Sequence, residues 1–222
     1  MSRIRAAILC AALGVAVLLA GPASAQRASL PIMPVAQQTP VWCWAASIEM
    51  VFRHYGAPNL NPAGNMQCAV VATLHPACAA DCTSCIVSGG STANMVMSMN
   101  AYRQAASAYG FFFPPVGYFL AGRMDFSSIA DRVDRGHPLI AGISPSGMGG
   151  LYPPTMSEHA VVIVGYDGVL GSVIVNDPYP YPPGFDPYSR AGGRRLTGGQ
   201  YEIAYGAFAG GLGYKDTIAF SD

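Results

Sequence analysis

Two residues that could share one reaction lie far apart in this chain. Cys43 lies between two tryptophans where a helix is expected to begin, and His159 is the first residue of an apolar stretch. A thiol at a helix N-terminus lies near the positive end of the helix dipole and near unpaired backbone N–H groups, which favour its anionic form. An imidazole beside it could take up the thiol proton and return it to a leaving group. The pair predicts a cysteine nucleophile with its base.

The surroundings of Cys43 set it apart from the small, buried and inert residue that a lone cysteine usually is. It opens a helix, follows a loop that contains a proline, and is preceded by Gln37 and Gln38. An amide side chain in that loop could donate a hydrogen bond to an oxyanion, together with the backbone N–H of Cys43. Either glutamine is a candidate for this donor.

His159 is favoured over the other three histidines because it combines a strand end with a polar partner downstream. His54 falls near the C-terminus of the first predicted helix, where a positive charge is simply stabilising. His75 lies inside a cysteine-rich stretch, and His137 lies in a turn next to a proline.

The expected partner of His159 follows another apolar strand, at Asn176 and Asp177. An aspartate would orient the imidazole and stabilise its cation, whereas an asparagine would mainly orient it. Asp177 is therefore preferred and Asn176 is the alternative.

The first 25 residues have the pattern of a secretory signal peptide. Arg3 and Arg5 precede an apolar run over residues 6–20, and residues 23–25 form a small-residue cleavage site. We therefore expect residues 1–25 to be removed and residues 26–222 to form one domain. No other stretch is long and apolar enough to span a membrane. The predicted location is secreted or periplasmic, without membrane contact after signal removal.

Charged residues make up only 11% of the chain and the formal net charge is zero. This composition argues against nucleic acid as a partner and against electrostatic attachment to a surface.

The cysteine count also fits an exported thiol enzyme. Six cysteines become five when Cys10 leaves with the signal, and four of the rest cluster at Cys68, Cys78, Cys82 and Cys85. In an oxidising compartment these four can form two disulfides, with three possible pairings, and leave Cys43 free. Zinc bound by Cys82, Cys85 and His75 is the rival interpretation, which the compartment disfavours, so no metal or other cofactor is expected.

The apolar periodicity places helices in the first half of the chain and strands in the second. The predicted helices cover residues 43–55 and 66–74, a segment from Ser91 or Thr92 to about Gly110, and one capped by Ser127 that ends at Gly136. The predicted strands cover residues 139–143, 159–166, 173–176, 201–208 and 217–220. This order indicates an α+β fold, with a helical lobe followed by a mostly antiparallel β-sheet lobe and the active site in the cleft between them.

The chain resembles papain-like cysteine peptidases. It is most similar to a bacterial branch that includes secreted effector proteases and the peptidases that cut double-glycine leader peptides. The resemblance rests on Gln37 with residues 43–47, on the 159–166 strand and on residues 176–178. It implies a papain-like fold with Cys43 as nucleophile and His159 as general base and acid. It also implies Asp177 as the orienting group, because that branch uses an aspartate, and Gln37 as the oxyanion donor ahead of Gln38.

This chain departs from the papain pattern in three respects. Pro40 stands where papain-type enzymes carry a cysteine, three residues before the nucleophile. The 159 − 43 = 116 residues between nucleophile and base are fewer than the roughly 130 to 150 of papain and cathepsins. Only residues 26–41 separate the cleavage site from the nucleophile, too few for an inhibitory pro-segment. Control would then come from folding, thiol oxidation or a separate protein inhibitor.

The predicted function is a secreted cysteine peptidase that cuts a polypeptide substrate through a Cys-His-Asp triad and a thioester intermediate. An amidase, transglutaminase or deamidase acting on peptide or cell-wall substrates is the alternative with the same nucleophile. A catalytically inert binding module is the other.

Two features near the predicted site have structural interpretations. Residues 177–188, rich in proline and tyrosine, are expected to form a stiff surface loop rather than an aromatic rim of the cleft. Trp42 could equally line the substrate pocket or only pack in the core.

Overall fold

The structure is a computed structural model that describes residues 27–79, 81–82, 85–89, 91–111, 117–145, 158–182 and 184–221. The predicted signal segment lies outside the described residues. None of the described helices combines the length and the apolar character needed to cross a bilayer.

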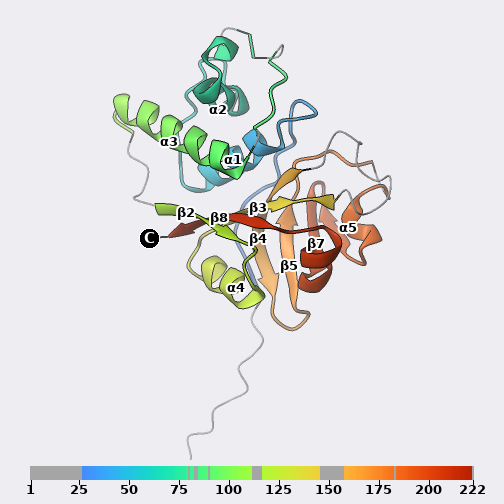
Figure 1. Cartoon of the computed structure of the whole chain (residues 1–222). Coiled ribbons are helices and arrows are strands. Elements are labelled where there is room, and N and C mark those ends of the chain that lie inside the picture. The colour runs from blue at the N-terminus through green and yellow to red at the C-terminus, as the bar shows by residue number, and fades with distance from the viewer. Residues whose placement is uncertain are drawn as a thin grey trace, which may run out of the picture.

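Three helices form a lobe on one side of the sheet (Figure 1). They are α1 (Cys43–His54), α2 (Met66–Leu74) and α3 (Thr92–Ala108). A short 3-10 helix, Pro76–Ala79, follows α2. Helix α1 packs against strand β4, and α2 packs against α3. Asn65 and Ser91 cap α2 and α3 by accepting the backbone N–H groups of Cys68 and Asn94.

Within the described residues, eight antiparallel strands form one sheet, in the order β2-β8-β3-β4-β5-β7-β6 with β1 paired along β4. The strands are β1 (Arg27–Ser29), β2 (Gly117–Gly122), β3 (Leu139–Ile143), β4 (His159–Asp167), β5 (Ser172–Asn176), β6 (Arg194–Thr197), β7 (Gln200–Ala204) and β8 (Asp216–Ser221). Helix α4 (Phe126–Asp134) lies on the side opposite the helical lobe, and the short α5 (Pro187–Arg190) lies near β6 and β7 (Figure 1).

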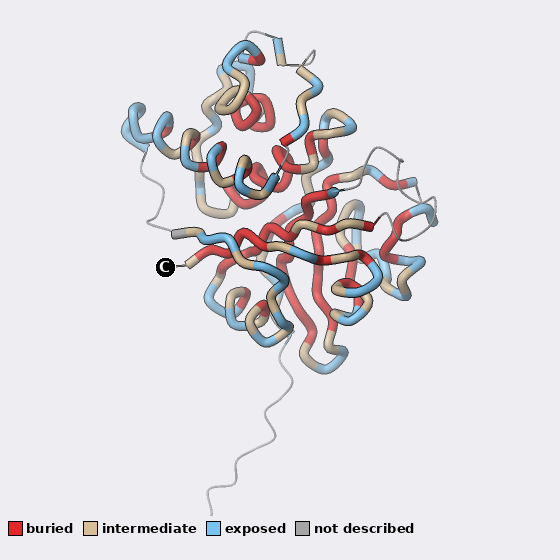
Figure 2. Tube along the Cα trace, in the orientation of Figure 1, coloured by how far each residue is buried: buried red, intermediate tan, exposed pale blue. Residues whose placement is uncertain are grey.

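Strand β4 is the centre of the molecule because both of its faces are covered. Successive side chains of a strand point to opposite faces. Accordingly, Val162 and Val164 join the hydrophobic cluster beneath the helical lobe, and Val161 and Ile163 join the cluster on the other face. All nine residues of β4 are buried (Figure 2). The α+β architecture expected from the sequence, with helices first and a mostly antiparallel sheet afterwards, is confirmed.

Most predicted elements occur close to their predicted bounds, with two corrections. Helix α4 is capped by Asp125, not Ser127, because the carboxylate of Asp125 accepts the backbone N–H of Ser128 at 2.7 Å. The strand predicted over residues 201–208 ends at Ala204. Its neighbour β5 begins at Ser172, which pairs with Ala204, and after this last pair the chain turns into a π-helical segment, Ala207–Gly211.

Two disulfides cross-link the helical lobe. Cys68 is bonded to Cys82 and Cys78 to Cys85, with Cα–Cα distances of 5.5 and 5.6 Å. In this structure Cys82 and Cys85 therefore have no thiolate to offer a metal. Cys43 is the free cysteine of the described chain.

Candidate active site

Cys43 is the first residue of α1, and the start of this helix carries nothing that offsets its dipole. Trp42 occupies the N-cap position without a side-chain cap, and no acidic residue lies in the first turn. The N–H groups of a first helical turn lack partners within the helix. The positive helix end therefore acts on the sulfur of Cys43.

His159 and Asp177 meet where two neighbouring strands of the sheet place them. His159 opens β4, and Asp177 directly follows the last residue of β5. The Nε2 atom of His159 lies 2.7 Å from Oδ1 of Asp177, and both side chains are fully buried. Because antiparallel β4 and β5 pair Val162 with Asn176, two residues separated by 18 positions come into contact.

The sulfur of Cys43 lies close enough to the imidazole of His159 and to the backbone N–H of Ala160 for both to act on its charge. Since Nε2 of His159 faces Asp177, the ring nitrogen left for the thiol is Nδ1. The helical lobe is held against β4 at this point, because Ser47 of α1 donates its hydroxyl to the carbonyl of Ala160 at 3.1 Å.

Electrostatics favour a thiolate–imidazolium pair. Burial by itself raises the pKa of Cys43, but attraction to the His159 charge, together with the nearby His159 ring and Ala160 N–H, lowers it more, so the pKa lies below its ordinary value. Burial by itself lowers the pKa of His159, but the charges of Asp177 and Cys43 raise it to about 10. Both shifts favour the state in which the proton resides on His159.

Asp177 is surrounded by donors from the segment that follows it. Its Oδ1 accepts the backbone N–H of Tyr179 at 2.8 Å, and its Oδ2 accepts the hydroxyls of Tyr188 at 2.9 Å and Tyr181 at 3.5 Å. The expectation that residues 177–188 form a plain surface loop is wrong in this respect. Tyr188 is completely buried and stacks on Tyr201, with ring centroids 4.3 Å apart.

Asn176, the alternative partner for His159, is occupied elsewhere. Its side-chain N–H₂ donates to the carbonyl of Ile32 at 2.8 Å, and its oxygen accepts from Gln200 at 2.8 Å. Asn176 thus joins β5 to the N-terminal segment and to β7, while Asp177 contacts the histidine.

The two candidate oxyanion donors differ in how they are engaged. Both ends of the Gln38 amide are paired with Asn65, at 3.1 and 2.6 Å. The side chain of Gln37 is buried and donates one hydrogen bond, to the carbonyl of Thr39 at 2.8 Å. A primary amide has two N–H donors, so Gln37 retains one that could serve an oxyanion. Its role there stays a prediction.

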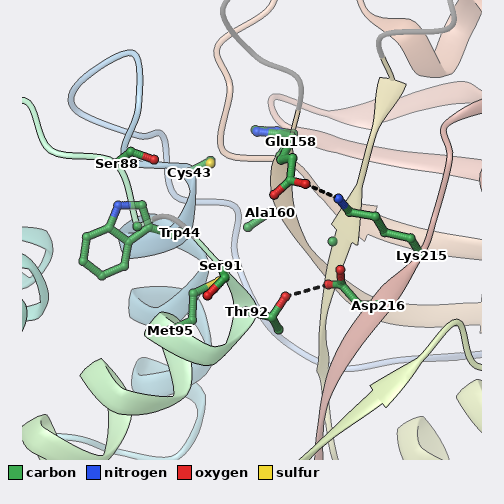
Figure 3. Close-up of a pocket in the computed structure, with 13 residues that line it drawn as sticks. Cys43, Trp44, Ser88, Ser91, Thr92, Met95, Glu158, Ala160, Lys215 and Asp216 are labelled. Atoms are coloured by element: carbon green, nitrogen blue, oxygen red, sulfur yellow. Dashed lines mark hydrogen bonds and ion pairs between the residues drawn. The ribbon is translucent and has the colours of Figure 1, made fainter.

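A pocket opens beside Cys43, between the helical lobe and the sheet (Figure 3). Trp44 and Met95 line its helical side, and Gly142, His159 and Asp216 line its sheet side. This is the cleft that the order of elements predicted. Trp42 does not line it, because it is buried in the core with its indole N–H bonded to the carbonyl of Cys85 at 3.1 Å.

The remaining histidines lie elsewhere. His54 contacts the carbonyl of Gly136 at 2.8 Å, His137 contacts the hydroxyl of Tyr55 at 3.0 Å, and His75 ends α2. Sequence reasoning missed Tyr188 and the pocket residues of α3 and β8. Each of them comes from a segment without a recognisable motif, and only the chain fold brings it to the site.

A family model identifies the class of protein to which this chain belongs. The model of the Peptidase_C39 like family matches residues 29–195. A solved structure of a candidate C39-like peptidase from Bacillus anthracis is similar, with a TM-score of 0.46 and 13% identity over 89% of this chain and 98% of that one. A search of curated proteins found no match.

The molecule is a member of the papain-like cysteine peptidases, with helices and an antiparallel sheet on the two sides of a cleft. Within that class, the family match covers three quarters of the chain, and the chain belongs to the Peptidase_C39-like family.

Proposed function

We propose that this protein is an exported cysteine endopeptidase in which Cys43 is the nucleophile, His159 the general acid and base, and Asp177 the group that orients His159. The observation that carries the proposal is the buried chain of contacts from Cys43 through His159 to Asp177, which opens on the pocket at its Cys43 end.

In the proposed reaction, the thiolate of Cys43 attacks the carbonyl carbon of a peptide bond, and the carbonyl electrons move to oxygen. The backbone N–H of Cys43 and the amide of Gln37 stabilise that oxyanion. His159 gives its proton to the leaving nitrogen as the C–N bond breaks, which leaves a thioester on Cys43.

Water then completes the cycle. His159 removes a proton from the attacking water as the new C–O bond forms, and the C–S bond breaks to release the acid product. The regenerated thiolate keeps the His159 cation as its partner. Asp177 remains ionised throughout and holds the ring in place.

Export is supported by two features. Residues 1–25 carry the signal pattern, and two disulfides link cysteines of the helical lobe. Disulfides persist in the periplasm and outside the cell and are rare in the cytoplasm.

The test is digestion of an unfolded protein by the purified enzyme, with the products identified by mass spectrometry. We expect new peptide termini from the wild-type protein and none from Cys43→Ala. Matching unfolding curves for the two proteins would show that the variant is folded. Ammonia release or cross-linking without new termini would refute the peptidase proposal and favour the amidase or transglutaminase alternative.

A further inference from the structure

Among the described residues, one carboxylate in the pocket forms no ion pair. Glu158 and Lys215 form an ion pair with each other, and the charge of His159 is matched by Cys43 and Asp177. Asp216 also lines the pocket and is partly exposed to it. Its carboxylate accepts a hydrogen bond from the hydroxyl of Thr92 at 2.8 Å, and within the described part of the chain it forms no ion pair.

The position of this carboxylate is fixed by its neighbours. Asp216 is the first residue of β8, next to β3, where it pairs with Gly142. A Cβ on residue 142 would overlap the Oδ1 atom of Asp216, so the carboxylate occupies the space that a side chain there would fill. Thr92, the first residue of α3, holds it from the helical lobe (Figure 3).

The helical side of the pocket, which faces Asp216, offers apolar surface beside polar groups. Trp44 and Met95 supply the apolar part and are both buried against the core, and Ser88, Ser91 and Thr92 line the same side. Lysine and arginine side chains have apolar stems with a charged end, so they can lie on such a surface while the end meets a carboxylate. We propose that Asp216 makes this pocket selective for a substrate lysine or arginine close to the scissile bond. This inference rests on the proposed peptidase function.

The test uses peptidyl acyloxymethyl ketones that alkylate the nucleophile. Two sets of three probes are made. The probes of one set carry lysine, norleucine or glutamate next to the ketone, and those of the other set carry the same residues one position further away. Norleucine has the linear stem of lysine without its ammonium group. The second-order rate of Cys43 labelling is measured by mass spectrometry for the wild type, Asp216→Asn and Asp131→Asn. Asp131 is exposed, paired with Arg135 and absent from the pocket lining, so its variant is the charge-matched control.

We expect the lysine probe to label wild type about tenfold faster than the norleucine probe in one of the two positions, as a charge-assisted contact would give. The ratio should fall to about 1 in Asp216→Asn and persist in Asp131→Asn. Iodoacetamide, which needs no pocket, should alkylate Cys43 equally fast in all three proteins. Rising salt should lower the lysine preference of the wild type, which tests the idea even if Asp216→Asn does not fold.

Two results would overturn the inference and leave the proposed function intact. One is a ratio near 1 for wild type in both positions while the probes still label Cys43, and the other is a preference that survives in Asp216→Asn. If no peptidyl probe labels Cys43 at all, the proposed function fails and the inference fails with it.

Discussion

At the scale of single residues, the reactivity of Cys43 depends on a neighbour that more than offsets burial. Burial alone would raise the pKa of the thiol, and attraction to His159 is the largest of the effects that lower it. The helix N-terminus adds to this. The proposed nucleophile is therefore activated by its contacts and not by exposure.

His159→Ala should shift the pH dependence of Cys43 alkylation upward. Without the imidazolium, burial remains and the main lowering effect is lost. In the wild type, the thiolate should form and react at pH values below the roughly 8.5 at which an ordinary thiol ionises. The ion pair should persist until His159 loses its proton near pH 10. We expect the variant to react at least about tenfold more slowly with iodoacetamide at pH 6, one pKa unit being tenfold in thiolate. An unchanged pH profile would contradict this account.

Tyr188→Phe tests a positioning residue. Tyr188 donates to Asp177, whereas the hydroxyl of its stacked neighbour Tyr201 is buried and has no hydrogen-bond partner among the residues that the structure describes. A hydrogen bond to a charged group contributes about 1.5 to 3 kcal/mol, so Tyr188→Phe should lower kcat about tenfold with KM nearly unchanged.

Tyr201→Phe is the matched control, since it removes an unsatisfied hydroxyl and should leave kcat and stability unchanged or slightly improved. Kinetics on a peptide taken from the mapped cleavage sites would decide. Equal effects of the two substitutions would rule out a specific role for the Tyr188 hydroxyl.

At the scale of elements, the disulfide-linked segment of residues 85–89 supports the start of α1. The indole N–H groups of Trp42 and Trp44 donate to the carbonyls of Cys85 and Val87, at 3.1 and 3.5 Å. Gly89 lies against the ring of Trp44, where an added Cβ would be 2.6 Å from Cδ2. The two tryptophans beside Cys43 are thereby anchored to a segment more than 40 positions away.

Gly89→Ala should therefore disturb the active site. Overpacking of this kind costs about 1 to 3 kcal/mol of stability, and displacement of Trp44 should also reduce the rate of Cys43 labelling by peptidyl probes. Gly198→Ala is the control, because its Cβ would meet nothing within 4 Å. Denaturant unfolding and labelling rates measure both effects, and wild-type values for Gly89→Ala would contradict the packing argument.

At the scale of the whole molecule, the cleft joins two lobes that are stabilised differently. The sheet is held by strand pairing and by apolar clusters on both of its faces. The helical lobe depends in addition on two disulfides around α2. The dependence of the helical lobe on disulfides suits an oxidising compartment, where disulfides persist.

The two disulfides should contribute unequally to stability. In the chain-entropy account, the stabilisation grows with the loop that is closed, and the sequence separations are 14 for Cys68–Cys82 and 7 for Cys78–Cys85. Doubling a loop adds about 0.6 kcal/mol. We expect Cys68→Ala/Cys82→Ala to lose about 3 kcal/mol of unfolding free energy, and Cys78→Ala/Cys85→Ala to lose less. Denaturant titration of the oxidised proteins checks the order, and the reverse order would show that packing outweighs loop closure.

The sequence by itself determined the change from helices to strands along the chain, the bounds of α2 and β3, and residues 43 and 159, with 176 and 177 as the candidates for their partner. These features follow from local signals: apolar periodicity, helix caps and polar residues at strand ends. Which of two adjacent residues faces His159 was decided by the tertiary structure, because the alternation of side chains along β5 directs Asn176 away and leaves Asp177 beside the ring. The disulfide pairing, the burial of Tyr188 and the approach of Asp216 to Cys43 also came only from the fold. Each depends on contacts between distant segments, for which local sequence carries no signal.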